Sequence, residues 1–133
     1  MKFGKIYELK YKIGIKNKTD KKPRIILIQE TEQRIIGINL NYYAPIIQEI
    51  IIELFNQEIF KRFSFDNELL MEALNRQKEI DNNKLARLYI SHNAENTKIM
   101  MKAAKNLKIK SATRLYKLLE HGCRIYKKEE IDE

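Results

Sequence analysis

The sequence lacks tryptophan and valine altogether, and it contains one cysteine, two prolines and four glycines among 133 residues. A single cysteine excludes an internal disulfide framework, so Cys123 is either a small buried apolar residue or a free thiol. No apolar run reaches the ~18 residues that a membrane-spanning helix needs, and the first residues lack the apolar core of a signal peptide. We therefore expect a soluble, cytoplasmic protein without a membrane partner.

The missing valine contrasts with 21 isoleucines, 19 lysines and 11 asparagines. AT-rich codons favour these three residues, so the bias describes the coding DNA more than the fold. The length predicts one compact domain, because domains commonly contain roughly 100 to 150 residues. Two independent enzymatic domains are excluded.

The formal net charge of +8 is distributed unevenly. Residues 1–28 carry a net +7 and residues 91–118 a net +6, whereas residues 29–60 carry a net −4. Two basic segments around an acidic one can recruit a polyanion without making the whole surface adhesive. This pattern indicates nucleic acid as the partner, with DNA favoured over RNA. An acidic protein partner, or simple solvation of lysine-rich faces, would explain the same pattern.

The first third of the chain predicts a small antiparallel sheet. Residues 7–15 alternate apolar and charged side chains, as a half-buried strand does. After a polar loop over 16–23, the apolar run 24–29 predicts a more deeply buried strand, and 34–40 predicts a third. Gly37 interrupts the third strand, which indicates a bulge or a close backbone approach. Three strands are too few to be stable alone, so a helix must cover one face.

Helical spacing dominates from Pro45 onward, a residue that suits the first position of a helix. This core helix is expected to extend to about residue 63, and further helices are expected after Ser64 or Asp66 and over 81–93. His92, near the end of the last of these, is expected to be a cap or surface residue.

The expected fold class is α+β. A small antiparallel, barrel-like meander packs on a long helix, and an all-helical C-terminal part follows. Within one compact domain we distinguish a sheet and core helix over 1–63, a helical part over 64–122 and a charged tail over 123–133.

The most basic helical segment begins at Asn96 or Thr97, either of which can cap a helix. A turn over 108–110 follows, Ser111 caps a last helix, and Gly122 is placed to end it. The order resembles a helix-turn-helix, whose second helix lies in the major groove. Lys108 stands where that motif usually has glycine, and Arg114 stands where an aliphatic residue is usual. The candidate phosphate-binding residues, on these helices and their turn, are Lys98, Lys102, Lys105, Lys108, Lys110, Arg114 and Lys117.

Residues for catalysis are scarce. Two histidines and one cysteine lack the close spacing of a zinc site, and the four isolated glycines form no phosphate-binding loop. A nuclease would need acidic residues to gather around Mg²⁺, but the spacing of the acidic residues fits exposed turns and a helix N-terminus equally well. Those acidic residues are Glu30, Glu32, Asp66 and Glu68. We expect no enzymatic activity, no metal and no cofactor.

A local motif, GINLNYYAP, begins at Gly37 and follows the end of the third strand. The preceding strand has the sequence PRIILI, which begins at Pro23. Asn39 and Asn41 can bond free backbone groups where the strand ends, Tyr42 and Tyr43 can pack the sheet against the helix, and Pro45 can start that helix. The residues that define the motif are Gly37, Asn39, Asn41, Tyr42 and Pro45.

The motif resembles a G-(I/L)-N-L-x-Y-x-x-P pattern in a group of small proteins of tailed bacteriophages. The resemblance covers residues 5–55 and departs at Tyr43, where leucine is usual. It implies a phage or mobile-element origin, with the host cytoplasm or the virion as location. Such proteins include both DNA-handling factors and virion components.

The leading hypothesis is a non-enzymatic accessory protein that binds nucleic acid through its Lys- and Arg-rich helical face, with the loop over 16–22 as a second contact. One alternative is a virion structural or assembly component, acting as a homo-oligomer or with a virion partner. Another is an inhibitor of host defence that binds a nucleoprotein.

Overall fold

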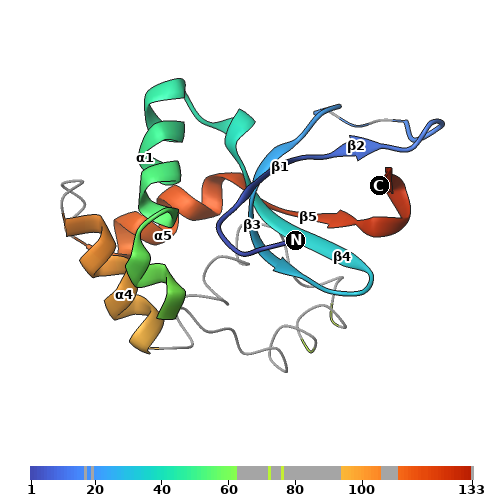
Figure 1. The fold of residues 1–133 in the computed structure, drawn as a ribbon. Coiled ribbons are helices and arrows are strands. Elements are labelled where there is room, and N and C mark those ends of the chain that lie inside the picture. Colours follow the sequence, from blue (N-terminus) through green and yellow to red (C-terminus); the bar gives the residue numbers. More distant parts are fainter. Residues whose placement is uncertain are drawn as a thin grey trace.

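The computed structural model describes residues 1–16, 18, 20–62, 72, 76, 94–105 and 111–132 (Figure 1). The strands are β1 (Ile6–Glu8), β2 (Lys10–Tyr11), β3 (Arg24–Glu30), β4 (Arg34–Asn39), β5 (Cys123–Lys127) and β6 (Ile131–Asp132). The helices are α1 (Pro45–Phe55), α4 (Ala94–Ala104) and α5 (Ala112–Gly122), with 3-10 turns η1 (Leu40–Tyr42), η2 (Glu58–Arg62) and η4 (Lys128–Glu130). Strands and helices together confirm the α+β class. The helices predicted between residues 64 and 93 lie outside the described residues.

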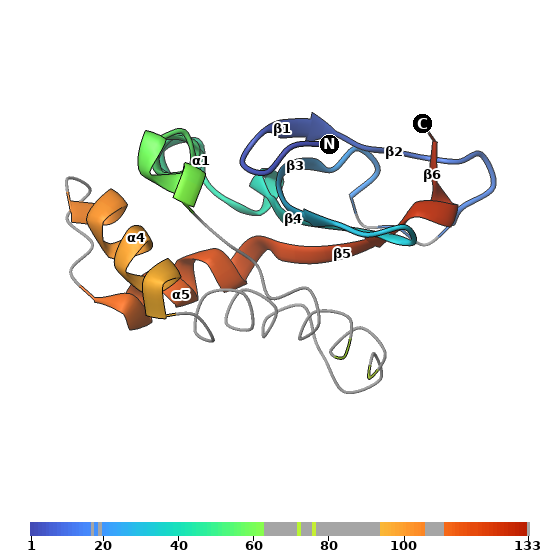
Figure 2. The same cartoon turned by 60° about the horizontal axis from the view of Figure 1, so that its bottom comes forward.

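The strands pair antiparallel throughout. The main sheet has the order β1-β3-β4-β5, and β2 pairs separately with β6. A short turn joins β3 to β4, in which the Thr31 amide donates to the Arg34 carbonyl oxygen at 2.9 Å. Figures 1 and 2 place α1, α4 and α5 at one end of the molecule and the β2–β6 pair at the other.

β3 is buried on both of its faces. Ile26 and Ile28 belong to the main core, which the three helices complete, whereas Ile25 and Leu27 belong to a second apolar cluster. That second cluster is built with Leu9, Ile35, Tyr126 and Ile131. A strand covered on both faces needs a continuous apolar run, which confirms the prediction of a deeply buried strand here.

Gly37 marks a close backbone approach, one of the two predicted possibilities. A Cβ at this position would lie 2.8 Å from Ile25 Cδ1 and 2.9 Å from the Ile26 carbonyl oxygen. The register shifts next to it, between Leu27 and Gln29 of β3, which leaves Ile28 as an extra residue. The bulge is therefore on β3, the strand that pairs with Gly37, and not on β4. It directly follows the pair that Leu27 forms with Gly37, so the close approach and the bulge are neighbours in the sheet.

The predicted first strand is shorter than its alternation suggested. Residues 7–15 contain β2 and part of β1, and the chain turns at Gly14, which has a φ of +95°. Ile13 is consequently fully exposed, although its position in the alternation predicted burial. The strand ends early because β2 leaves the main sheet to pair with β6, which is only two residues long.

The predicted long core helix is also shorter, since α1 ends at Phe55 and a separate turn, η2, follows. Pro45 begins α1 as predicted. Phe55 and Phe60 stack with ring centroids 5.0 Å apart, and Phe3 contacts both rings. A straight helix would carry Phe60 away from Phe55, so this aromatic cluster favours the break at Asn56.

The prediction of a charged tail over 123–133 is wrong, and so is an all-helical C-terminal part. β5 pairs with β4 along its whole length, with Ile36 opposite Ile125. Cys123 is buried with a free thiol, whose pKa burial raises to about 12, so it is a small core residue. The acidic residues that follow β5 in the sequence give the whole segment the composition of a charged tail.

Candidate nucleic-acid interface

α4 buries its apolar side chains and exposes its lysines. Ile99 and Met100 are almost fully buried against the main core. Helical periodicity then places the polar positions on the opposite side. The exposed positions include the predicted Lys98 and Lys102, and Lys105 just beyond the helix end.

α5 repeats this arrangement. The Ser111 hydroxyl accepts a hydrogen bond from the Arg114 amide at 3.2 Å, which confirms the predicted cap. Leu115 and Leu119 are fully buried. The exposed positions include Arg114, Lys117 and His121. We refer to Lys98, Lys102, Lys105, Arg114 and Lys117 as the basic helix faces.

The two helices contact each other through Thr97 and Tyr116, whose hydroxyl oxygens lie 3.0 Å apart. The turn that would make them a helix-turn-helix, with Lys108 and Lys110, lies outside the described residues. The helix-turn-helix therefore stays a prediction.

The basic helix faces carry little compensating charge. Lys98 and Glu95 lie 3.9 Å apart, but both side chains are about 70% exposed, and such a pair is worth little. Within the described part of the chain, the other four cations of these faces make no ion pair. They are available for an external anion.

The motif at the end of β4 forms a bonded polar cluster. The buried Asn39 side-chain amide donates to Asp20 Oδ2 at 2.8 Å and to the Tyr126 hydroxyl at 3.1 Å, while its oxygen accepts from the Asn41 amide at 2.9 Å. Asn41 Nδ2 donates to Asp20 and to the Lys22 carbonyl oxygen. The prediction that both asparagines bond backbone groups where the strand ends is confirmed. We call Asp20, Asn39, Asn41 and Tyr126 the polar cluster.

The two tyrosines of the motif differ. Tyr43 is buried, but its hydroxyl bonds α5 and not the predicted partner, the helix that Pro45 begins. The hydroxyl donates to the Leu118 carbonyl oxygen at 2.6 Å and accepts from the Gly122 amide at 2.8 Å. Burial raises the pKa of Tyr43 above its usual value. Tyr42, predicted to pack the same way, is instead 39% exposed, and the Arg124 guanidinium lies 4.5 Å from its ring centroid. Tyr42 is therefore a surface residue.

A cavity of about 190 Å³ opens beside the polar cluster. We call it the tyrosine pocket, and its walls include Tyr11, Tyr42, Tyr126, Lys18, Arg124 and Asp20. Lys18 is 3.0 Å from Glu130 and lies over the Tyr11 ring at 5.4 Å. Burial, with the negative charges of Glu130 and Asp20 adding to it, raises the pKa of Tyr11.

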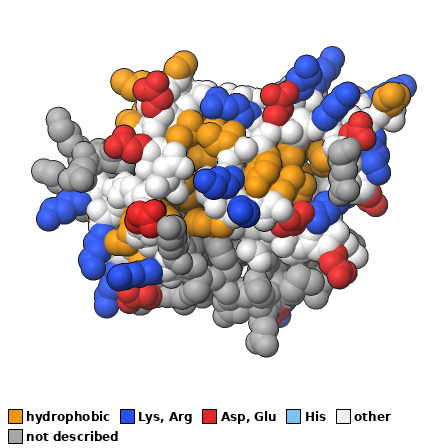
Figure 3. All heavy atoms as spheres, in the orientation of Figure 1, with side chains coloured by type: hydrophobic (Ala, Val, Ile, Leu, Met, Phe, Trp, Pro, Cys, Tyr) orange, Lys and Arg blue, Asp and Glu red, His pale blue; other side chains and the backbone are white. Residues whose placement is uncertain are grey.

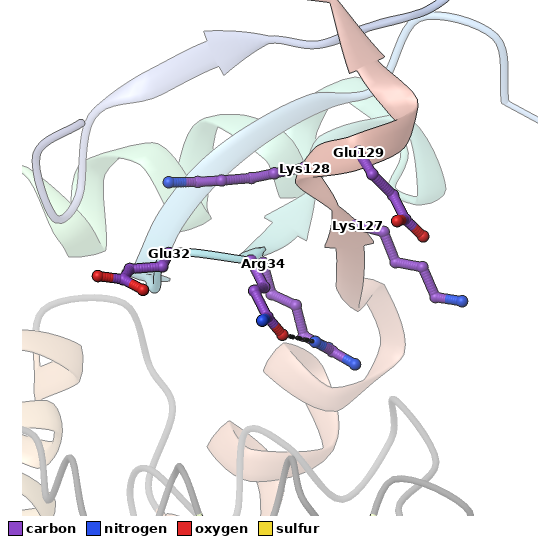
Figure 4. Close-up of a pocket in the computed structure, with 6 residues that line it drawn as sticks. Glu32, Arg34, Lys127, Lys128 and Glu129 are labelled. Atoms are coloured by element: carbon purple, nitrogen blue, oxygen red, sulfur yellow. Dashed lines mark hydrogen bonds between the residues drawn. The ribbon is translucent and has the colours of Figure 1, made fainter.

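A second cavity of about 380 Å³ lies at the β3–β4 turn. It is lined by Glu32, Gln33, Arg34, Lys127, Lys128 and Glu129. Figure 4 shows that these side chains diverge: Glu32 and Lys128 extend to one side, and Arg34, Lys127 and Glu129 to the other. Groups that point apart cannot grip one small ligand, so the tyrosine pocket is the better candidate site.

The nuclease alternative receives no support from Glu30. Lys128 Nζ lies 2.7 Å from the Glu30 carboxylate and, mainly through this hydrogen bond, lowers its pKa. Asp66 and Glu68 lie outside the described residues. Among the residues that the structure describes, no three acidic, histidine or cysteine side chains gather as a metal site would require.

Basic side chains do not form one continuous surface on the face in Figure 3. There, Lys and Arg side chains form separate groups with acidic and apolar side chains between them. Within the described residues, no helix has the length and apolar character of a bilayer-spanning segment.

Sequence reasoning missed Asp20, Arg124 and Tyr126 as site residues. Arg124 and Tyr126 belong to β5, whose five residues show no alternation of buried and exposed positions, and acidic residues follow it directly, so no local signal reveals this strand. Asp20 stands in a polar loop, where an aspartate is ordinary. Its side-chain partners are Asn39 at the end of β4 and Asn41 in η1, which no local pattern can indicate.

No protein-family model matches this chain, and no curated protein and no solved structure matches it significantly. The resemblance to proteins of tailed bacteriophages therefore stays a prediction that rests on the motif alone.

Proposed function

We propose that this protein is a non-enzymatic accessory protein, of phage or mobile-element type, that binds nucleic acid through the basic helix faces. One observation carries the proposal: among the described residues of α4 and α5, together with Lys105 directly after α4, the exposed charged side chains are the five cations of these faces and Glu95. Exposed cations on helices, four of them without an ion pair among the described residues, are suited to phosphate contacts, which need charge and position but no base-specific geometry.

Counterion release predicts how strongly salt should weaken such binding. If all five cations contact phosphates of duplex DNA, the logarithm of the binding constant falls by about 4.5 per tenfold increase in salt concentration. Between about 50 and 200 mM NaCl, affinity should fall roughly 500-fold. DNA is the expected ligand, and parallel titrations with duplex RNA of the same sequence test that choice.

The test is a fluorescence-polarisation titration of a labelled duplex at two salt concentrations. The variant Lys98→Gln/Lys102→Gln/Lys105→Gln should lower affinity about 500-fold at about 0.1 M salt and reduce the salt slope by about three. The matched control removes three exposed lysines elsewhere, as Lys2→Gln/Lys5→Gln/Lys127→Gln. Absence of binding by the unaltered protein at low salt would refute the proposal, and equal losses in the two variants would refute the assigned face.

A second candidate function, assembly through an apolar surface, is favoured by α1. Ile46 is 68% exposed, and Ile47, Ile50 and Ile52 are only half-buried. Figure 3 also shows apolar side chains on the surface between α1 and the strands. An assembly component should form oligomers in analytical ultracentrifugation, and Ile46→Ser should dissociate them. A monomer at high concentration that binds DNA would favour the first function.

A further inference from the structure

We infer that the tyrosine pocket receives one unstacked base of a single-stranded nucleic acid, with the exposed face of α5 holding the phosphates of the strand that leads into it. This inference rests on the proposed function and refines it, because it names the form of nucleic acid and the part of it that the pocket recognises.

The size of the tyrosine pocket suits a single ring system. Its volume is about 190 Å³. A cavity of about 150 Å³ holds one benzene ring, whereas drug-sized ligands need roughly 300 Å³ or more. The cavity therefore has room for one base.

The walls of the pocket offer a surface for stacking. Tyr42 is 39% exposed, and the Arg124 guanidinium covers its ring at 4.5 Å. Tyrosine rings and guanidinium planes are the groups on which proteins stack unpaired bases. Tyr11 from β2 and the largely buried Tyr126 from β5 complete the lining.

The polar wall favours the edge of a base over a phosphate. Asp20 Oδ2 accepts hydrogen bonds from Asn39 and Asn41, and Oδ1 accepts one from the Lys22 amide at 3.3 Å. A carboxylate has about four lone-pair sites, so Oδ1 keeps acceptor capacity for a base amino group. The negative charge of Asp20 opposes a phosphate inside the pocket, and the charge of Lys18 is already matched by Glu130 at 3.0 Å. A base with an exocyclic amino group is therefore the expected occupant.

The cationic face of α5 leads to this pocket. Arg114, Lys117 and His121 share one exposed face at i, i+3 and i+7, and His121 Nε2 donates to the Tyr42 carbonyl oxygen at 3.0 Å. Lys117 stands about 6 Å and Arg114 about 10 Å before His121 along the helix axis. Phosphates bound there would place the next base near Tyr42.

A base inside a duplex is already stacked and paired, so only a single strand, or a flipped nucleotide, can fill the pocket without the cost of unstacking. The protein should therefore prefer a single strand to the duplex of the same sequence, although a single strand has the lower charge density.

The experiment compares a labelled strand of roughly 15 nucleotides with its duplex by fluorescence polarisation at about 100 mM NaCl. The unaltered protein should bind the single strand about 10-fold more tightly. Tyr42→Ala should weaken single-strand binding about 5- to 100-fold and leave duplex binding unchanged, because one stacking contact is lost. Ile46→Ala, which removes another exposed apolar side chain, is the matched control.

Arg124→Lys provides a second variant in case Tyr42→Ala fails to fold. It keeps the positive charge but removes the flat guanidinium, so single-strand affinity should fall several-fold while the salt slope is unchanged. Single-strand binding that neither variant weakens, or a loss that is equal for the duplex, overturns the inference while the proposed function stands. Absence of binding to both forms at low salt overturns the proposed function as well.

Discussion

The end of β4 and the exposed faces of α4 and α5 both carry polar residues that sequence reasoning singled out, but they use them in opposite ways. In the polar cluster, Asn39 is 1% exposed and bonds three other side chains or backbone groups. On the basic helix faces, Lys102, Lys105, Arg114 and Lys117 are exposed and make no ion pair within the described part of the chain. The first set holds the fold together, and the second set is free to bind.

Because of this difference, substitutions in the two regions should affect different properties, namely folding stability and binding affinity. Changes at the end of β4 should lower stability, and they should affect binding only through Tyr42 and the pocket beside it. Changes on the basic helix faces should lower affinity and leave stability nearly unchanged, since exposed substitutions usually alter it by less than about 0.5 kcal/mol.

The largest effect is expected from Gly122→Ala. A Cβ at Gly122 would collide with the Tyr43 ring and lie 2.9 Å from the Asn39 carbonyl oxygen. Overpacking of this kind costs about 3 kcal/mol, or roughly 10 °C in Tm for a chain of this length. Calorimetry measures the loss, with the exposed Thr113→Ala on the same helix as control. An unchanged Tm would mean that α5 and η1 can move apart freely.

A smaller loss of stability is expected from Asn39→Ala. The change leaves the buried Tyr126 hydroxyl without a donor partner and removes the cap of η1, which should cost about 2 kcal/mol. Urea denaturation measures this as a lower midpoint. The control is Asn41→Ala at an exposed position of the same cluster, which should cost about 0.5 kcal/mol. Equal losses would show that burial of Asn39 is unimportant.

Arg114→Ala tests the phosphate-binding role of the basic helix faces. Loss of one phosphate contact should lower affinity about 8-fold at 0.1 M salt for every sequence, with no change in Tm. Polarisation titrations with two unrelated duplexes measure this, and Lys5→Ala is the control. A loss confined to one sequence would indicate instead that α5 contacts base edges in a groove.

The smallest effect is expected from Glu30→Gln, which breaks the pair between Glu30 and Lys128. Because the pKa of Glu30 is lowered in the folded protein, the pair stabilises the fold above the ordinary value of 4.5 and loses this effect as the pH falls through the lowered value. The partly exposed pair should contribute less than about 1 kcal/mol. Urea midpoints at pH 7 and pH 3 should differ less in the variant than in the unaltered protein, whereas the exposed Glu32→Gln should leave the difference unchanged.

Prediction from sequence succeeded where one local cause dominates. Ser111 and Pro45 begin their helices because a hydroxyl acceptor and a fixed φ act within one turn of the chain. The continuous apolar run of β3 and the periodic apolar face of α4 likewise report burial directly.

Prediction failed where the cause is distant. Ile13 belongs to a regular alternation but is fully exposed, because the pairing of β2 with β6 ends that strand early. β5 was assigned to a charged tail because acidic residues follow it, and its pairing with β4 depends on a segment more than eighty residues away. Gly122, predicted as a helix end, also allows the close approach of Tyr43, which no local pattern reveals.

Periodicity and capping act over a few residues, so the α+β class, the buried strand β3, the starts of α1 and α5, and the cations on α4 and α5 follow from the amino-acid sequence. The polar residues that bond one another, and the cavity shared by Tyr11, Tyr42, Arg124 and Tyr126, depend instead on how distant segments pack. Those residues come from three separate segments, and their distances are set by sheet register and core packing, which involve the whole chain at once.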